Sequence, residues 1–226
     1  MIDIEQFISQ GSGLYTVAEA ARYARMHPST LSRWLQGNNY GQRVFVTTED
    51  NTKFIGFHDF IQILAVRNLR VHYGIPLQTI REAVESASTE FGQNYPFARK
   101  HKTFLFDKQI WIKLEETREL VQISGKSHGQ KGMTQVIEPF LKDIYFDPAS
   151  GLASRYDAFT RNNLKIVMNP QLRFGEPMLE GCGYTPEALF EAAKTEGSAE
   201  AAAKIYGVST QAVEVCIEYF DYLKAA

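Results

Sequence analysis

Residues 15–36 restrict the fold more than any other stretch of this 226-residue chain, because they predict two short helices joined by a tight turn. Thr16 followed by Glu19 has the spacing of a capping box, which begins the first helix. Pro28 suits the first position of the second helix, where its missing N–H costs nothing. The turn has no glycine, which turns of this kind often contain. The pattern fits either a DNA-binding helix-turn-helix or an ordinary helical hairpin in a core.

The second predicted helix has one apolar and one polar face. Leu31, Trp34 and Leu35 recur at helical spacing, so we expect them to face the interior. Short hydroxyls and one arginine remain outside, and such side chains hydrogen-bond base edges and phosphates in the major groove. The candidate DNA contacts on this helix are Ser29, Thr30, Ser32 and Arg33. Two further residues, Thr16 and Arg43, are expected to touch the DNA backbone.

The segment after this helix predicts a wing. Residues 43–57 contain two apolar stretches around a Glu-Asp-Asn turn, which indicates a β-hairpin. An amphipathic helix follows over 59–70, Gly74 ends it, and Pro76 begins another helix.

These elements together resemble the MerR-type winged helix-turn-helix family over roughly the first 90 residues. Thr30, Leu31 and Trp34 match its Thr-Leu-x-x-Trp phrase, and residues 59–84 match its later pair of helices. The resemblance implies binding to double-stranded operator DNA, with helix 28–35 in the major groove. A palindromic operator requires a two-fold protein, so we expect a homodimer.

Charge is distributed unevenly along a chain whose net charge is only −2. Residues 97–173 hold thirteen Lys/Arg and eight Asp/Glu, whereas residues 174–226 hold three and nine. The middle of the chain predicts a hairpin around residues 107–108, a short helix over 133–141 and a strand at 144–146. A basic cluster at 99–102 either reaches DNA beside the site or forms a solvated rim.

The last 60 residues predict a second compact unit. A strand over 164–168 and a short strand at 178–179 are separated by turns rich in glycine and proline. Three helices follow, with N-caps at Thr185, Ser198 and Ser209. Ala202 and Ile205 are expected to face inward, and Val213, Cys216, Ile217 and Phe220 to share one face.

The last two of these helices repeat the helix-turn-helix pattern, with a different surface. The polar positions of the final helix are Thr210, Gln211, Glu214 and Glu218. Two carboxylates repel phosphates, so a protein contact is favoured, either dimerisation or toxin docking. Base contacts by Thr210 and Gln211 remain the alternative.

Residues 164–222 resemble the bacterial family called domain of unknown function 433. The matching phrases are Asn169-Pro170, Gly175-x-Pro177, Gly181-x-Gly183-x-x-Pro186, and Ser198, Ala203 and Tyr206-Gly207-Val208-Ser209. With the winged unit before it, the resemblance implies a VapB-type antitoxin that neutralises a PIN-like ribonuclease toxin and represses its own operon. The alternative is a free-standing MerR-like transcriptional regulator without a toxin partner.

Composition and the absence of certain motifs argue against membrane proteins, exported proteins and enzymes. No apolar run approaches the roughly 20 residues that cross a bilayer, and the N-terminus lacks a signal-peptide pattern, so we expect a cytoplasmic protein without membrane contact. Cys182 and Cys216 are expected to be buried thiols. Five scattered histidines lack zinc-ligand spacing, and no dinucleotide or nucleophile-elbow motif is present. We expect no catalytic residues, metal or cofactor, and hence no enzyme.

The expected fold is mainly α with small β-hairpins, in three segments. These are a winged helix-turn-helix over 1–96, a basic linking region over 97–163, and a helical domain over 164–226.

Overall fold

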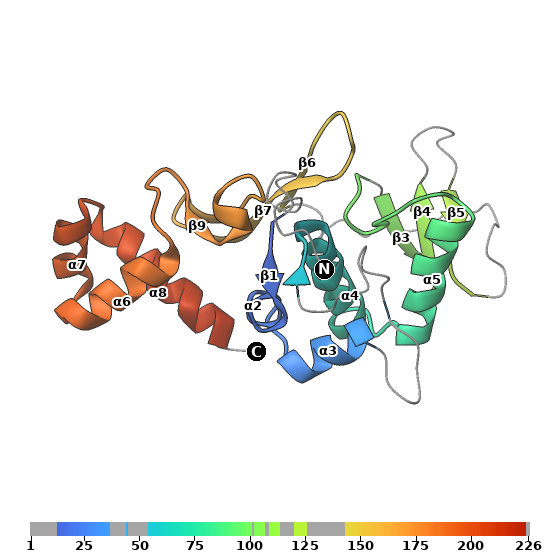
Figure 1. Ribbon diagram of the computed structural model, residues 1–226, viewed down its shortest axis with the longest axis horizontal. Coiled ribbons are helices and arrows are strands. Elements are labelled where there is room, and N and C mark those ends of the chain that lie inside the picture. The colour runs from blue at the N-terminus through green and yellow to red at the C-terminus, as the bar shows by residue number, and fades with distance from the viewer. Residues whose placement is uncertain are drawn as a thin grey trace. The chain divides into compact units, whose positions relative to one another are not determined.

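The computed structural model of the protein describes residues 13–36, 44, 54–100, 102–106, 109–113, 120–125 and 143–224 (Figure 1). The chain divides into two compact units. The N-terminal unit comprises residues 16–153, and the C-terminal unit comprises residues 154–226 together with residues 1–15. The boundary therefore falls inside the expected linking region, whose strands are shared between the two units.

The first predicted helix is α2 (Val17–Tyr23), and its capping box is confirmed. The Glu19 amide donates to Thr16 Oγ1 at 3.2 Å, and the Thr16 amide donates to Glu19 Oε2 at 2.8 Å. Ala20 and Ala21 on its inner face are fully buried, so a second helix can approach closely.

The turn after α2 places a non-glycine residue in the left-handed region. Arg25 has φ 52°, a conformation that costs an ordinary residue on the order of 1 kcal/mol. The Arg25 carbonyl accepts a hydrogen bond from Arg67 Nε at 3.0 Å, which ties the turn to a later helix. Glycine usually occupies such a left-handed position. Here the hydrogen bond from Arg67 helps to hold Arg25 in that conformation instead.

The second predicted helix is α3 (Pro28–Gln36). Leu31, Trp34 and Leu35 are buried as predicted. Helices α4 (Phe57–Val71) and α5 (Leu77–Thr89) follow, joined by a turn in which Gly74 has φ 62°. Figure 1 shows α3, α4 and α5 within the N-terminal unit.

The predicted wing lies mostly outside the described residues, and Arg43 is among those not described. Of its first strand only Val44 is described; it is buried, and its amide donates to the Trp34 carbonyl at 2.8 Å. Its second strand is β2 (Phe54–Ile55), which pairs with β1 (Tyr15–Thr16). Phe57 was expected in this strand but begins α4, because Gly56 already serves as the helix N-cap.

The middle of the chain forms a three-stranded antiparallel sheet. Its strands are β3 (Lys102–Phe106), β4 (Gln109–Lys113) and β5 (Leu120–Gln122). Phe106 pairs with Gln109, which confirms the predicted hairpin around residues 107–108. The strand at 144–146 is also confirmed, as β6 (Ile144–Phe146), while the expected helix over 133–141 lies outside the described residues.

The C-terminal unit begins with antiparallel strands β7 (Ala153–Arg161), β8 (Leu164–Met168) and β9 (Met178–Leu179). The last two were predicted; β7 was not. The signal for β7 was the pair Asn162-Asn163, whose φ values of 49° and 63° make the tight turn between β7 and β8.

Helices α6 (Pro186–Glu196), α7 (Ala199–Tyr206) and α8 (Thr210–Lys224) complete this unit. The predicted caps are confirmed: the hydroxyls of Thr185, Ser198 and Ser209 each accept a backbone N–H three residues ahead, at 3.1–3.2 Å. The three helices pack around Ala193, Ala202, Ala203 and Val213.

One inward position was predicted incorrectly. Ile205 is 62% exposed, whereas Ala202 and Ala203 on the same helix are buried. At 3.6 residues per turn, Ile205 lies nearly opposite Ala203, so a short helix that buries its alanines turns Ile205 outward.

Candidate nucleic-acid interface

The residues of α3 that are predicted to contact DNA differ in their exposure to solvent. Ser29 and Arg33 are exposed, while Thr30 and Ser32 are half-buried. The Ser29 hydroxyl lies 2.8 Å from His27 Nδ1, and Arg33 Nη2 donates to Thr30 Oγ1 at 3.3 Å. Arg33 is therefore held along its own helix, with most of its guanidinium donors still available.

Thr16 is exposed, but it already has partners. Its hydroxyl accepts the Glu19 amide and also donates to Glu19 Oε2 at 2.8 Å. A phosphate at this hydroxyl would meet the Glu19 carboxylate, which repels it. The role of Thr16 in the structure is the helix cap, and this makes it the weakest of the predicted contacts.

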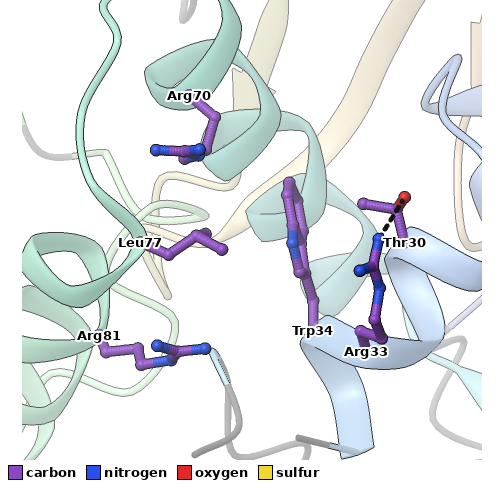
Figure 2. A pocket seen from close by; sticks show the side chains of 6 residues that line it. All are labelled: Thr30, Arg33, Trp34, Arg70, Leu77 and Arg81. Atoms are coloured by element: carbon purple, nitrogen blue, oxygen red, sulfur yellow. Dashed lines mark hydrogen bonds between the residues drawn. The ribbon is translucent and has the colours of Figure 1, made fainter. Parts of the chain in front are cut away.

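Sequence reasoning missed a pocket in the N-terminal unit that contains Arg33. It is lined by Thr30, Arg33 and Trp34 of α3, by Arg70 of α4, and by Leu77 and Arg81 of α5. In Figure 2 Trp34 stands between Arg33 and the side chains of Arg70 and Arg81. The pocket has a volume of about 280 Å³. Its three arginines are 37 and 11 residues apart in the sequence, a spacing that matches no local motif. Only the packing of three helices brings them to one place.

Each arginine of this pocket is positioned differently. Arg70 is exposed and donates from Nη1 to the Ile75 carbonyl at 2.7 Å, across the turn between α4 and α5. Arg81 is half-buried, and its Nε is buried with no hydrogen-bond partner. In Figure 2 the Arg81 side chain extends from α5 toward α3.

Among the described residues, no acidic side chain balances the positive charge of this pocket. Within the described part of the chain, no carboxylate forms an ion pair with Arg33, Arg70 or Arg81. Three like charges at one pocket repel one another and favour binding of an anion.

The cations of the C-terminal sheet show the opposite arrangement. Arg155 Nε lies 2.7 Å from Oδ1 of buried Asp157, and Lys165 Nζ lies 2.7 Å from its Oδ2. Arg155 also pairs with Glu180. Burial acts to raise the pKa of Asp157, but the hydrogen bonds from Arg155 and Lys165 lower it below its ordinary value. This network satisfies its own charges, so it is structural.

The final helix α8, part of the second predicted helix-turn-helix, presents polar and acidic side chains. Gln211, Glu214 and Glu218 of α8 are exposed, and Glu218 pairs with Arg161 at 3.2 Å. The charge of Arg161 is thus neutralised by Glu218, and the carboxylates on this face of α8 repel a phosphate.

Burial shifts the pKa of several titratable groups in the described part of the chain. Burial raises the pKa of Asp59 to about 7, and the backbone amide of Gly56 opposes this rise. Burial lowers the pKa of His58, whose Nε2 lies 3.0 Å from the Ala153 carbonyl oxygen. Burial raises the pKa of Cys216 to about 12, which suits an inert thiol, while Cys182 is only half-buried.

The described residues offer neither a metal-binding cluster nor a membrane-spanning helix. They contain no group of three or more His, Cys, Asp or Glu side chains that could hold a metal ion. None of their helices combines the length and apolar character needed to cross a bilayer.

Comparisons with known proteins identify a distant relative and a shared fold. No protein-family model matches the chain, so the two family resemblances drawn from its motifs stay predictions. The chain is 23% identical over 220 residues to a Mycobacterium tuberculosis protein named "Putative antitoxin VapB45", covering 87% of this chain and 89% of that one.

Among solved structures, the crystal structure of Rv2018 from Mycobacterium tuberculosis matches with a TM-score of 0.62 and 19% identity. The match covers 90% of this chain and 96% of that one. The protein is thus a distant homologue of a chain named as an antitoxin, and it shares its fold with Rv2018 along nearly its whole length.

Proposed function

We propose that this protein is a DNA-binding antitoxin that neutralises a PIN-like ribonuclease toxin and represses its own operon. The observation that carries the proposal is the 23% identity to the protein named "Putative antitoxin VapB45", which extends over most of both chains. A match that covers 87% of this chain extends into both units, so it favours a common role and not a single shared module.

The DNA-binding part of the proposal rests on the N-terminal unit. Helix α3 presents Ser29 and Arg33 on its exposed face, and the side chain of Arg33 has no acidic partner among the described residues. A short, capped helix pair with an available arginine is suited to enter the major groove, with Thr30 and Ser32 supporting the contact. We propose that a homodimer binds a palindromic operator in this way.

The C-terminal unit supports the partner-binding part. Several of its large apolar side chains are exposed: Leu172, Phe174, Tyr184, Ile205 and Tyr222. Residues 174–226 are also strongly acidic. Exposed apolar groups within an acidic surface favour a protein partner with a basic rim over nucleic acid.

The DNA-binding role is tested by Arg33→Ala in the full-length protein. Fluorescence anisotropy with the duplex upstream of its own coding region should show binding weakened by about 1–3 kcal/mol. Arg161→Ala is the matched control, because Arg161 is also exposed but is paired with Glu218 on α8. Equal affinities of the Arg33→Ala variant and the wild type would remove α3 from the interface.

The antitoxin role is tested with Ile205→Glu. Because Ile205 is 62% exposed, the substitution leaves the core intact while placing a charge on the proposed partner surface. Co-expression with the nuclease encoded beside it should show lost neutralisation. If no neighbouring nuclease is inhibited by the wild-type protein, the antitoxin role is wrong. Retained operator binding would then favour a free-standing transcriptional regulator.

A further inference from the structure

The pocket formed by Thr30, Arg33, Trp34, Arg70, Leu77 and Arg81 is more specific than a general basic surface. Its cations come from three different helices and line one hollow of about 280 Å³. A flat basic face attracts any polyanion, whereas a concave one selects an anion that fits between its walls.

The donors at this pocket are only partly used. A guanidinium carries five N–H donors. Arg33 uses one toward Thr30 and Arg70 uses one toward the Ile75 carbonyl, while Arg81 Nε is buried without an acceptor. Because this Nε is buried, the donors that Arg81 can offer a ligand are those of its two terminal Nη groups, for which no partner is found among the described residues.

We propose that this pocket binds one phosphoryl group, with Arg81 and Arg70 as its principal ligands and Arg33 closing it from α3. Planar guanidinium groups match the paired oxygens of a phosphate, and several of them satisfy its oxygens from different directions. The apolar wall formed by Trp34 and Leu77 suits the carbon skeleton to which the phosphate is esterified.

Two sources supply this chemistry. One is a phosphate of the DNA backbone next to the groove occupied by α3, and this source rests on the DNA-binding function proposed above. The other is a free phosphorylated small molecule. Because Arg33 belongs to both the pocket and the DNA-facing side of α3, a free ligand would compete with DNA.

The experiment uses Arg81→Gln and Arg70→Gln in the full-length protein, with Arg161→Gln as control. Circular dichroism establishes that each variant is folded; Arg70 is exposed, so its variant provides the test if Arg81→Gln unfolds. One arm titrates inorganic phosphate and pyrophosphate calorimetrically at constant ionic strength. The other measures anisotropy with the upstream duplex and an unrelated duplex at several salt concentrations.

If the source is DNA, each pocket variant should weaken binding to both duplexes by about tenfold and reduce the salt slope by about one. If the source is a free ligand, the wild type should bind phosphate or pyrophosphate and both variants should lose at least about tenfold. Arg161→Gln should match the wild type in both arms.

The proposal is overturned if folded Arg81→Gln and Arg70→Gln keep the wild-type salt slope and if phosphate binding is unchanged or absent. Operator binding by the wild type in that case leaves the proposed function standing. Pocket-dependent phosphate binding without affinity for either duplex has the reverse meaning: the pocket is right and the DNA-binding function is wrong.

Discussion

The helix pairs α2–α3 and α7–α8 are built alike but carry opposite surfaces. Each begins with a hydroxyl cap, at Thr16 and Ser198, and each buries adjacent alanines where the helices meet. The exposed side of α3 bears an arginine without an acidic partner in the described structure. The exposed side of α8 bears carboxylates, one of which neutralises Arg161.

This comparison shows that the helix pair alone does not specify a ligand. The packing of two short helices requires small residues and caps, and both pairs have them. The charges on the second helix, and those on the elements packed beside it, determine whether the surface attracts or repels a phosphate. In the N-terminal unit these elements add two more arginines, from α4 and α5.

The largest expected effect tests whether the two pairs are stabilised independently. Leu31→Ala in α3 and Leu223→Ala in α8 each truncate one buried leucine. Each should lower the free energy of unfolding by about 2–5 kcal/mol. Hydrogen exchange should show the loss of protection confined to the unit that carries the substitution. Equal loss in both units would mean that the chain unfolds as one cooperative block.

A smaller loss of stability is expected from substituting a glycine of the C-terminal unit that lies in close contact with another side chain. Gly175 has φ 85° in the short helix η1 (Arg173–Gly175), and the Tyr15 hydroxyl donates to its carbonyl at 2.8 Å. A β-carbon at Gly175 would overlap that hydroxyl, so Gly175→Ala should lower stability by about 2–3 kcal/mol.

Gly181→Ala is the control for this prediction. Gly181 has a similar φ of 82° but open space around the added methyl, so only the backbone strain of about 1 kcal/mol remains. Chemical denaturation measures both variants. Equal losses would show that the Tyr15 contact adds nothing.

The buried carboxylates of the two units should respond oppositely to pH. The folded state keeps the Asp59 proton up to about pH 7, whereas the ordinary value is 3.8. Between these values the folded state binds more protons, so stability falls as pH rises and levels off above pH 7. Asp59→Asn should remove up to about 1 kcal/mol per pH unit of this slope, measured by urea unfolding from pH 4.5 to 7.5.

Asp157 in the C-terminal sheet provides the contrasting case. Its pKa is lowered, so it stabilises the fold above its unfolded pKa and loses this contribution as pH falls through the folded pKa. Asp157→Asn should therefore destabilise the protein at neutral pH and progressively less in acid. The same pH trend for the Asp59 and Asp157 variants would contradict the comparison.

The smallest effect concerns the turns of the two helix pairs. Arg25 and Gly207 both adopt left-handed φ values, 52° and 64°. Arg25→Gly should relieve strain and stabilise the N-terminal unit by about 0.5–1 kcal/mol, while Gly207→Ala should cost about 1 kcal/mol. Thermal unfolding measures both changes, and changes of the same sign would show that side-chain contacts, not backbone strain, govern these turns.

Several elements could be predicted from the residues alone because their signals are local. The capping box of Thr16 and Glu19, the caps at Thr185 and Ser198, and the hairpin around residues 107–108 each depend on neighbours within a few positions. The buried face of α3 followed equally from helical spacing. Such features require no knowledge of the rest of the chain.

Where prediction failed, the reason was either the packing of neighbouring helices or a local turn or cap signal that the pattern analysis did not use. Ile205 is exposed because the helices around α7 bury its alanines instead, and Phe57 begins a helix because Gly56 caps it. The strand β7 was missed because the asparagine pair that turns it back shows its role only next to β8.

The sequence by itself determined the local elements, the capped helix pairs and the uneven charge distribution along the chain, since these depend on adjacent residues. The tertiary structure decided which distant charges meet. Arg33, Arg70 and Arg81 share one pocket because α3, α4 and α5 pack together, and Lys165 reaches Asp157 because β7 and β8 pair. Electrostatic interaction depends on separation in space, and residue spacing within a linear sequence does not reveal it.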